Sequence, residues 1–314
     1  MEVRPLGTSG LRVSRLGLGT MTWGRQTTAD DAKAQLDMYR NAGGTLIDSA
    51  ASYADGGAET ILGEALAARG DRDEVVLSTK AGIGRRGGGR HVDASRRSLL
   101  NGLDDSLARL RTDHVDLWEV HAWDPYVPFE ETCAALDHAV SSGRARYVGI
   151  SNYSGWQTGT VAAWQRAWPG RAPIVANQVE YSLLRRGIED DVLPACATHG
   201  IGVLAWSPLA GGVLTGKYRG GIPKGTRGSD ESWRDRVLAY TDEHGSRVLD
   251  AVATAAEGLE STPTAVALSW IRDRPGVAAA LIGARTVDQL AGLLLADAFH
   301  LPDQIRVALD DVSA

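Results

Sequence analysis

The feature that most constrains the fold is a repeated alternation of short apolar runs with amphipathic helical segments. This order is typical of parallel strands joined by crossover helices. The expected strands are residues 15–19, 44–48, 75–80, 115–121, 146–150, 174–179, 201–206 and 279–282, and the expected helices are residues 29–42, 58–68, 95–110, 129–142, 155–168, 188–199, 263–273 and 286–297. Eight such units predict a closed α/β fold, the (β/α)8 TIM barrel.

The main alternative architecture is an open, doubly wound sheet. That fold normally carries a glycine-rich phosphate loop after its first strand. Residues 16–21 contain a Gly-x-Gly pair, but no third glycine follows at the required place. The barrel is therefore expected. Because no Pro/Ser-rich linker or charge block interrupts the chain, residues 1–314 are expected to form a single domain.

Three segments are expected to lie outside the repeating units. Residues 4–13 predict a short β-hairpin that turns at Ser9 and Gly10. Residues 208–247, rich in Gly, Arg and Asp, predict a large loop on the C-terminal face of the barrel. The basic run at residues 85–90 is rich in glycine and is expected to be a mobile loop.

Charge and composition exclude several classes of function. The net charge of -6 argues against binding to nucleic acid or to an anionic membrane surface. No apolar run approaches the ~20 residues of a membrane span, and the N-terminal residues contain no apolar signal core. Cys133 and Cys196 fit neither a disulfide framework nor a metal-ligand spacing. We therefore expect buried thiols, no metal and a cytoplasmic location.

Four chemically distinctive residues lie at or just after the ends of expected strands. Asp48 ends the second strand, Tyr53 follows it, Lys80 ends the third strand and His121 ends the fourth. Taken singly, each has an ordinary interpretation as a turn, surface or packing residue. Since the C-terminal ends of barrel strands open on one face, the four side chains are expected to converge there.

This set of side chains can deliver a proton to a carbonyl oxygen. Tyr53, with an ordinary pKa of about 10, would be made more acidic by the Lys80 ammonium, and Asp48 would keep Lys80 charged. His121 would donate a hydrogen bond to the carbonyl oxygen. A nicotinamide would supply the hydride, since no side chain can. Glu119, two residues before His121, would need a partner inside the barrel that the sequence does not identify.

Residues at the later strand ends suit such a cofactor, although each also has an ordinary turn or core interpretation. The side chains that can pair with a carboxamide are Ser151, Asn152 and Gln178. Trp206 could stack on a flat heterocycle. Ser207, Lys217 and the amides of residues 209–212 could face phosphate groups.

Several longer segments resemble the aldo-keto reductase superfamily, and within it the bacterial branch related to the potassium-channel β subunits. The resemblance covers residues 3–297 or so. The matching segments are residues 4–14, 17–24, 48–53, 62–66, 106–110, 116–121, 148–152, 177–184 and 206–218, together with Glu59. The resemblance implies a (β/α)8 barrel closed at its N-terminal end by the hairpin, and reversible, NADPH-dependent reduction of an aldehyde or ketone.

The resemblance also implies roles for individual residues. Tyr53 would be the acid, with Lys80 and Asp48 tuning it and His121 orienting the carbonyl group. The implied cofactor-binding residues are Gly19, Thr20, Met21, Asp48, Ser151, Asn152, Gln178, Trp206, Ser207, Pro208, Leu209, Gly211, Lys217, Gly283, Arg285 and Gln289.

The chain departs from the family pattern near its C-terminus. Many relatives carry a Lys-Ser pair where this chain has Gly283 and Ala284, so the usual lysine at the 2′-phosphate of NADPH is absent. Arg285 is the natural substitute, because a guanidinium can bind phosphate through two hydrogen bonds. Relatives also tend to have Glu-Asn at Gly292 and Leu293, where those side chains meet adenine. NADPH remains the expected cofactor, with NADH as the less favoured alternative.

Two other functions fit parts of the sequence. Lys80 could form a Schiff base with substrate, as in an aldolase, but the Asp48 carboxylate argues against that chemistry. The second alternative is a nicotinamide-binding redox sensor or regulatory subunit with slow turnover, as the channel β relatives suggest.

The substrate is expected to be a small carbonyl compound with apolar or aromatic character. The side chains expected to wall its pocket, beside Tyr53 and His121, are Met21, Trp23, Trp123, Tyr126 and Trp233. Trp233 could equally pack within its own loop. Neither the particular carbonyl compound nor the oligomeric state follows from the sequence.

Overall fold

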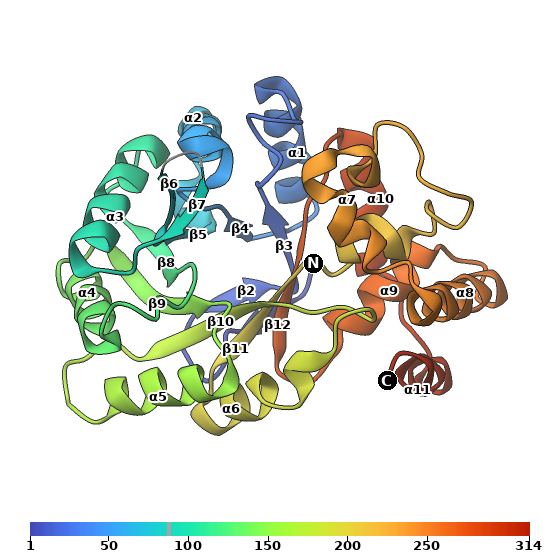
Figure 1. Ribbon diagram of the computed structural model, residues 1–314. Helices are drawn as coiled ribbons and strands as arrows, with labels where there is room; N and C mark the ends of the chain where they lie inside the picture. Colours follow the sequence, from blue (N-terminus) through green and yellow to red (C-terminus); the bar gives the residue numbers. More distant parts are fainter. Residues whose placement is uncertain (87–88) are drawn as a thin grey trace.

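The computed structural model describes residues 1–86 and 89–314, and a closed barrel of parallel strands forms its centre (Figure 1). The barrel strands are β3 (Leu16–Gly19), β4 (Leu46–Asp48), β5 (Val76–Ala81), β8 (Val115–Val120), β9 (Ala145–Ser151), β10 (Ile174–Glu180), β11 (Gly202–Trp206) and β12 (Val277–Ile282). Each pairs with the next, and β12 pairs with β3 to close the barrel. The prediction of a (β/α)8 barrel is confirmed, with small shifts at the strand ends.

The helices that the sequence predicted lie around the outside of the barrel (Figure 1). They are α1 (Ala29–Asn41), α2 (Gly57–Arg69), α3 (Arg96–Leu110), α4 (Phe129–Ser141), α5 (Gly155–Arg166), α6 (Val192–His199), α9 (Pro263–Arg272) and α10 (Val287–Leu294). Three begin at a threonine, Thr28, Thr262 or Thr286, whose side chain accepts a hydrogen bond from a backbone N–H of the first turn. These caps fix where the helices start. Within the described part of the chain, no helix is long and apolar enough to cross a membrane.

Several elements were not expected from the sequence. The stretch 208–247, predicted as a loop, contains the 3-10 helices Ala210–Thr215 and Arg227–Ser229, the helix α7 (Glu231–Leu238) and the start of α8 (Glu243–Gly258). The other unexpected helix is α11 (Asp303–Val312), which packs on α8 (Figure 1). Helix α7 is short and highly charged, whereas α11 packs its apolar face, Ile305, Leu309 and Val312, against the core.

The described residues of the run 85–90, which was expected to be a mobile loop, lie in two strands. Strand β6 (Ile83–Arg86) pairs antiparallel with β7 (Gly89–Val92). Residues 87 and 88 lie outside the described residues.

The predicted N-terminal hairpin is present and closes one end of the barrel. Its strands β1 (Val3–Pro5) and β2 (Arg12–Ser14) pair antiparallel. Leu6, Leu11 and Val13 of the hairpin are buried in a cluster with barrel residues that include Leu117 and Leu204. The hairpin turn approaches the start of β11, where the backbone N–H of Thr8 donates to the carbonyl oxygen of Gly200 at 2.9 Å. The hairpin thus covers the N-terminal ends of the barrel strands, and the cavity described below lies at their C-terminal ends.

Close contact between the hairpin and β11 makes Gly202 a test of this closure. A Cβ atom at position 202 would lie 2.5 Å from the backbone nitrogen of Gly7. We expect Gly202→Ala to lower the free energy of unfolding by about 1–3 kcal/mol, the usual cost of overpacking. Gly258→Ala is the matched control, since a Cβ there meets nothing within 4 Å. Urea unfolding of both variants checks this, and equal stability of the two would contradict the closure.

Candidate functional site

A cavity of about 1430 Å³ opens at the C-terminal ends of the barrel strands. Its walls include the strand-end residues Gly19, Asp48, Ser151, Gln178 and Trp206. A pocket for a single small ligand usually has a volume of roughly 300–1,000 Å³. The cavity therefore has room for a large cofactor and a small substrate together.

A buried ion pair lies beneath this cavity. The Lys80 Nζ atom donates to Asp48 Oδ1 at 2.6 Å and to the carbonyl oxygen of Ser49 at 2.7 Å. The side chains are 0% and 3% exposed, respectively. Burial acts to lower the pKa of Lys80, but the negative charges of Asp48 and its neighbours outweigh burial and raise that pKa. Lys80 is thus held as an ammonium, as the sequence predicted.

Tyr53 lies beside this ion pair and beside His121. The Lys80 Nζ atom is 5.4 Å from the centre of the Tyr53 ring, and the Tyr53 and His121 ring centres are 6.1 Å apart in an edge-to-face arrangement. Burial raises the pKa of Tyr53 to about 12, and the Lys80 charge offsets only part of this effect. Lys80 therefore lowers the pKa of Tyr53, as predicted, but desolvation exceeds this attraction and leaves the net pKa above its ordinary value.

His121 is a neutral imidazole in this environment. Burial, followed by the charges of Lys80 and Arg90, lowers the pKa of His121 well below its ordinary value. Its Nδ1 atom is buried and forms no hydrogen bond within the described residues. A neutral ring carries a single N–H donor, so His121 can donate one hydrogen bond to an oxygen in the cavity.

Glu119 has partners inside the barrel that the sequence could not identify. Its Oε2 atom accepts hydrogen bonds from Ser78 Oγ at 3.2 Å and from Gln178 Nε2 at 3.0 Å. The same Gln178 nitrogen also donates to Asp48 Oδ1 at 2.9 Å. Burial raises the pKa of the Glu119 carboxyl to about 8. Glu119, Gln178, Asp48 and Lys80 therefore form one buried hydrogen-bonded network.

The residues expected to hold a carboxamide do come together at the ends of β9, β10 and β11. Ser151 Oγ donates to the carbonyl oxygen of Gln178 at 2.9 Å. Asn152 Nδ2 donates to the carbonyl oxygen of His121 at 3.0 Å, while Asn152 Oδ1 accepts from Trp206 Nε1 at 3.1 Å. Asn152 adopts a left-handed φ of 60°, a conformation that functional sites often retain. These contacts hold Asn152 and the Trp206 ring in place on the wall of the cavity.

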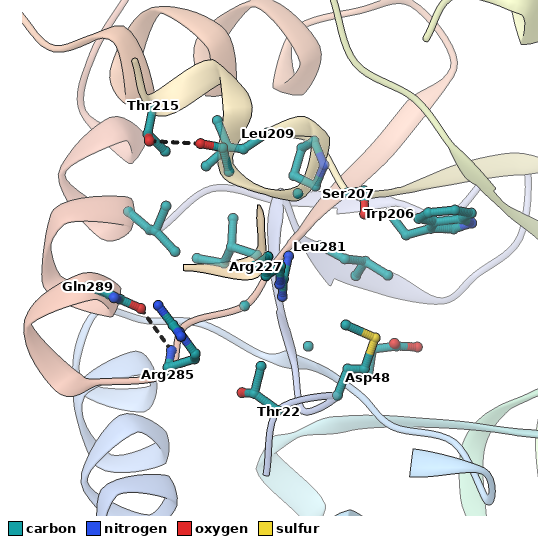
Figure 2. Close-up of a pocket in the computed structure, with 18 of the residues that line it drawn as sticks. Thr22, Asp48, Trp206, Ser207, Leu209, Thr215, Arg227, Leu281, Arg285 and Gln289 are labelled. Carbon is teal, nitrogen blue, oxygen red and sulfur yellow. Dashed lines mark hydrogen bonds between the residues drawn. The ribbon is translucent and has the colours of Figure 1, made fainter. Parts of the chain in front are cut away.

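A cluster of cations lies in the part of the cavity lined by the turn after β11 and the start of α10. Figure 2 shows Arg285 and Gln289 on one side of the pocket and Asp48 and Trp206 on the other. Burial and the nearby charges of Arg227 and Arg285 lower the pKa of Lys217. Across residues 1–86 and 89–314, these three cations form no ion pair with a carboxylate, so mutual repulsion is uncompensated. Such a cluster is suited to an anionic ligand.

Backbone geometry supports an anion site at the same place. Ser207, Ala210, Gly211 and Gly212 in the turn after β11 all have positive φ angles. A Cβ atom at Gly212 would lie only 2.6 Å from Lys217 Nζ. Glycine therefore leaves space for the ammonium to approach the turn.

Most residues predicted from the sequence to bind a cofactor line the cavity. Those that do are Gly19, Met21, Asp48, Ser151, Asn152, Gln178, Trp206, Ser207, Pro208, Leu209, Gly211, Lys217, Gly283, Arg285 and Gln289. Thr20 does not line it. The Thr20 side chain is fully buried and its hydroxyl donates to Ser49 Oγ at 2.9 Å.

The structure places three of the aromatic residues predicted for the substrate pocket elsewhere. Trp23 is 0% exposed and its Nε1 atom donates to Gln35 in the core. Trp123 packs in an aromatic cluster with Tyr153 and Trp156, and Tyr126 is 93% exposed and lies off the cavity. Position along the chain does not determine the direction in which these side chains point. Met21 and Trp233 do line the cavity.

Sequence reasoning also missed two arginines in the segment predicted as a loop. Arg227 and Arg236 both line the cavity. The Arg236 guanidinium lies 4.8 Å from the Trp206 ring centre and its Nη2 atom donates to Glu180 Oε2 at 2.7 Å. The basic residues of this segment were the available signal, but their contacts depend on how α7 folds back over the barrel.

Comparison with known proteins gives a consistent result. The Aldo/keto reductase family model matches residues 15–314. The chain is 36% identical to a probable voltage-gated potassium channel subunit beta of Oryza sativa subsp. japonica, over 92% of this chain and 89% of that protein. It is 35% identical to the uncharacterized oxidoreductase YrpG of Bacillus subtilis, over 99% and 96%. It is 36% identical to L-glyceraldehyde 3-phosphate reductase of Escherichia coli, over 92% and 86%.

The buried ion pair predicts a large loss of stability when its negative partner is removed. In Asp48→Asn, the Lys80 ammonium would remain desolvated with the Ser49 carbonyl as its main partner. We expect the free energy of unfolding to fall by about 3–5 kcal/mol, as for other broken buried pairs. Asp37→Asn breaks the pair with Arg69, in which Asp37 is 41% exposed, and should cost at most about 1 kcal/mol. Guanidinium unfolding measures both, and similar losses would mean that Lys80 does not depend on Asp48 for its charge.

Proposed function

The chain belongs to the aldo/keto reductase family and is an NAD(P)H-dependent oxidoreductase, and we propose that it reduces an aldehyde or ketone to the alcohol. In this proposal the reaction is reversible, NADPH is the cofactor and Tyr53 is the proton donor. The observation that carries the proposal is the position of Tyr53 against the Asp48–Lys80 ion pair and a neutral His121 on one cavity.

Each member of the set has a distinct task in this proposal. A bound nicotinamide supplies the hydride to the carbonyl carbon. The Tyr53 hydroxyl gives its proton to the carbonyl oxygen as negative charge develops there, while His121 donates a hydrogen bond that orients that oxygen. The Lys80 ammonium stabilises the phenolate that remains on Tyr53, and Asp48 keeps Lys80 charged.

The high pKa of Tyr53 is compatible with this role. A phenol with a pKa of about 12 is a weak acid in isolation. The oxygen that receives the proton develops the basicity of an alkoxide, which is greater than that of a phenolate. The proton transfer is therefore favourable once the hydride has begun to move. In the reverse direction, the same phenolate accepts the proton of an alcohol.

The residues along the cavity fit a nicotinamide dinucleotide. We assign Ser151, Asn152 and Gln178 to the carboxamide and Trp206 to stacking on the nicotinamide ring. The residues assigned to the remainder of the cofactor are Gly19, Met21, Ser207, Pro208, Leu209, Gly211, Lys217, Gly283, Arg285 and Gln289. The turn after β11, with its positive φ angles and adjacent Lys217, suits the pyrophosphate.

Preference for NADPH is supported by the cation cluster. NADPH carries a 2′-phosphate that NADH lacks, and Lys217, Arg227 and Arg285 have no carboxylate partner within the described ranges. Arg285 lies at the start of α10, where its backbone N–H donates to Gln289 Oε1 at 3.0 Å. We therefore assign Arg285 to the 2′-phosphate, in place of the lysine that many relatives carry two positions earlier, at position 283.

A second function is favoured by one comparison. The similarity to a probable voltage-gated potassium channel subunit beta suggests a nicotinamide-binding regulatory subunit with slow turnover. Steady-state oxidation of NADPH with a panel of aldehydes, ketones and sugars separates the two functions. Sustained turnover supports the reductase, and a single slow turnover with every carbonyl compound supports the sensor.

Removal of the Tyr53 hydroxyl is the direct test of the proton donor. We expect Tyr53→Phe to lower kcat for carbonyl reduction by about 10²–10⁴-fold, the usual contribution of general acid catalysis. The Kd for NADPH, measured by fluorescence, should change little. Tyr126→Phe is the control, because Tyr126 is 93% exposed and off the cavity. Reduction by Tyr53→Phe at the wild-type rate would refute the assignment.

Arg285 provides the test of cofactor preference. Loss of a hydrogen-bonded charge typically costs about 1.5–3 kcal/mol, so Arg285→Ala should lower kcat/KM for NADPH by roughly 10–100-fold. The value for NADH should stay the same, since NADH has no 2′-phosphate. Arg247→Ala, which removes an exposed arginine paired with Glu243, should affect neither cofactor. An equal loss with both cofactors would mean that Arg285 does not read the 2′-phosphate.

A further inference from the structure

Glu119 is a buried acidic residue to which the proposed reaction assigns no task. It is 0% exposed and lies on β8 two residues before His121. In the barrel, Glu119 is directly opposite Lys80 of β5 and Gly149 of β9. A Cβ atom at Gly149 would lie 3.1 Å from Glu119 Cγ, so glycine provides the space in which the Glu119 side chain lies.

The hydrogen bonds of Glu119 reach only one of its two carboxyl oxygens. Oε2 accepts two hydrogen bonds, from Ser78 Oγ and Gln178 Nε2, whereas the buried Oε1 has no partner within the described residues. In an ionised carboxylate both oxygens carry charge and both need donors. Because Oε1 has no donor and the Asp48 carboxylate already belongs to the same network, an ionised Glu119 would add a second, poorly satisfied negative charge inside the barrel. The neutral form avoids this charge.

Glu119 is the second acceptor for the Gln178 amide group, whose orientation is set by Asp48. Both hydrogens of Gln178 Nε2 are used, one toward Asp48 Oδ1 at 2.9 Å and one toward Glu119 Oε2 at 3.0 Å. The Asp48 carboxylate can only accept, so the nitrogen must face the interior. Gln178 lines the cavity, and the group left to face it is the amide oxygen, an acceptor for the NH₂ of a carboxamide.

Four titratable side chains surround Glu119. Lys80 on β5 and Asp48 on β4 are charged, whereas Tyr53, in the turn that follows β4, and His121 are neutral. Ser78 and Gln178 are neutral donors, and Gly149 of β9 contributes no side chain. With Glu119 neutral, the buried set contains one positive and one negative charge. Ionisation of Glu119 adds a second negative charge, which disfavours a phenolate on Tyr53.

We propose that Glu119 is a neutral carboxylic acid at neutral pH and a positioning residue for the reaction: it accepts the second hydrogen bond of the Gln178 amide, whose orientation Asp48 sets, and its ionisation in the alkaline range weakens Tyr53 as a proton donor. The second part of this proposal, the effect of Glu119 on proton donation, is its catalytic half and rests on the proposed role of Tyr53. The first part, the protonation of Glu119 and its contact with Gln178, does not depend on that role.

The relevant pH range follows from the neighbouring groups. Glu119 has a pKa of about 8, whereas that of Tyr53 is about 12, that of Lys80 is raised and that of His121 is well below its ordinary value. Of these four groups, Glu119 alone changes charge near pH 8. The reduction rate should therefore decline through this range to a lower plateau, by up to roughly tenfold for each pKa unit by which Tyr53 is weakened.

The first experiment needs no activity. Infrared spectra of the full chain should show a protonated-carboxyl C=O band at neutral pH that disappears above pH 8 or so in the wild type. Glu119→Gln should lack this band, because glutamine keeps the acceptor for Gln178 but cannot ionise. Glu59→Gln is the matched control: Glu59 is also 0% exposed but is paired with Arg109, so the band should persist. Absence of the band in the wild type, or its survival in Glu119→Gln, would overturn the proposal.

Stability supplies a second readout that is independent of turnover. The folded-state pKa of Glu119 is raised above its ordinary value of 4.5, so its contribution to stability is complete below that value and is lost as the pH rises through about 8. The urea midpoint should therefore fall less over this range in Glu119→Gln than in the wild type. An equal fall in the two proteins would contradict a buried neutral acid at position 119.

The catalytic half is tested by the pH profile of kcat/KM for carbonyl reduction. The decline near pH 8 should be absent from Glu119→Gln and should move to higher pH in Ser78→Ala, since the Ser78 hydrogen bond favours the ionised form. An unchanged decline in both variants would overturn the catalytic role of Glu119. If the infrared result holds and Tyr53→Phe is fully active, the fault lies in the proposed proton donor instead.

Discussion

The buried ion pair between Lys80 and Asp48 is the interaction on which the rest of the site depends. An isolated ammonium would be neutralised at that depth, because burial opposes its charge. Asp48 keeps Lys80 charged and, through Gln178, ties the pair to Glu119. The barrel makes this possible, since neighbouring strands bring the ends of β4, β5, β8 and β10 to one small volume.

The proposed proton-transfer residues and the cation cluster lie in different parts of the cavity. Tyr53 and His121 lie near the strand ends, while Lys217, Arg227 and Arg285 gather where the turn after β11 meets the start of α10. Binding energy from a remote phosphate can hold the reactive end of a cofactor in place without weakening the chemistry there. In the proposed assignment, Arg285 takes the place of the lysine of the common Lys-Ser pair at the remote phosphate, far along the cavity from Tyr53.

The sequence predicted the barrel well because apolar runs of strand length report burial directly. It also predicted that Asp48, Lys80 and His121 converge, since strand ends share one face. It failed where the answer depends on side-chain direction, as for Trp23 and Trp123. Polar segments such as α7 carry no apolar stripe, so the cavity position of Arg236 could not be foreseen. The net pKa of Tyr53 could not be foreseen because the balance of burial against the Lys80 charge depends on depth.

In the proposed mechanism the Lys80 charge acts on the Tyr53 hydroxyl, and titration of that hydroxyl measures this effect directly. Fluorotyrosine placed at position 53 would bring the phenol into an accessible pH range, and ultraviolet difference spectra would report its ionisation. Because Lys80 favours the phenolate, replacing it in Lys80→Met should raise the titration midpoint. A midpoint that is unchanged or lower in Lys80→Met would contradict the account.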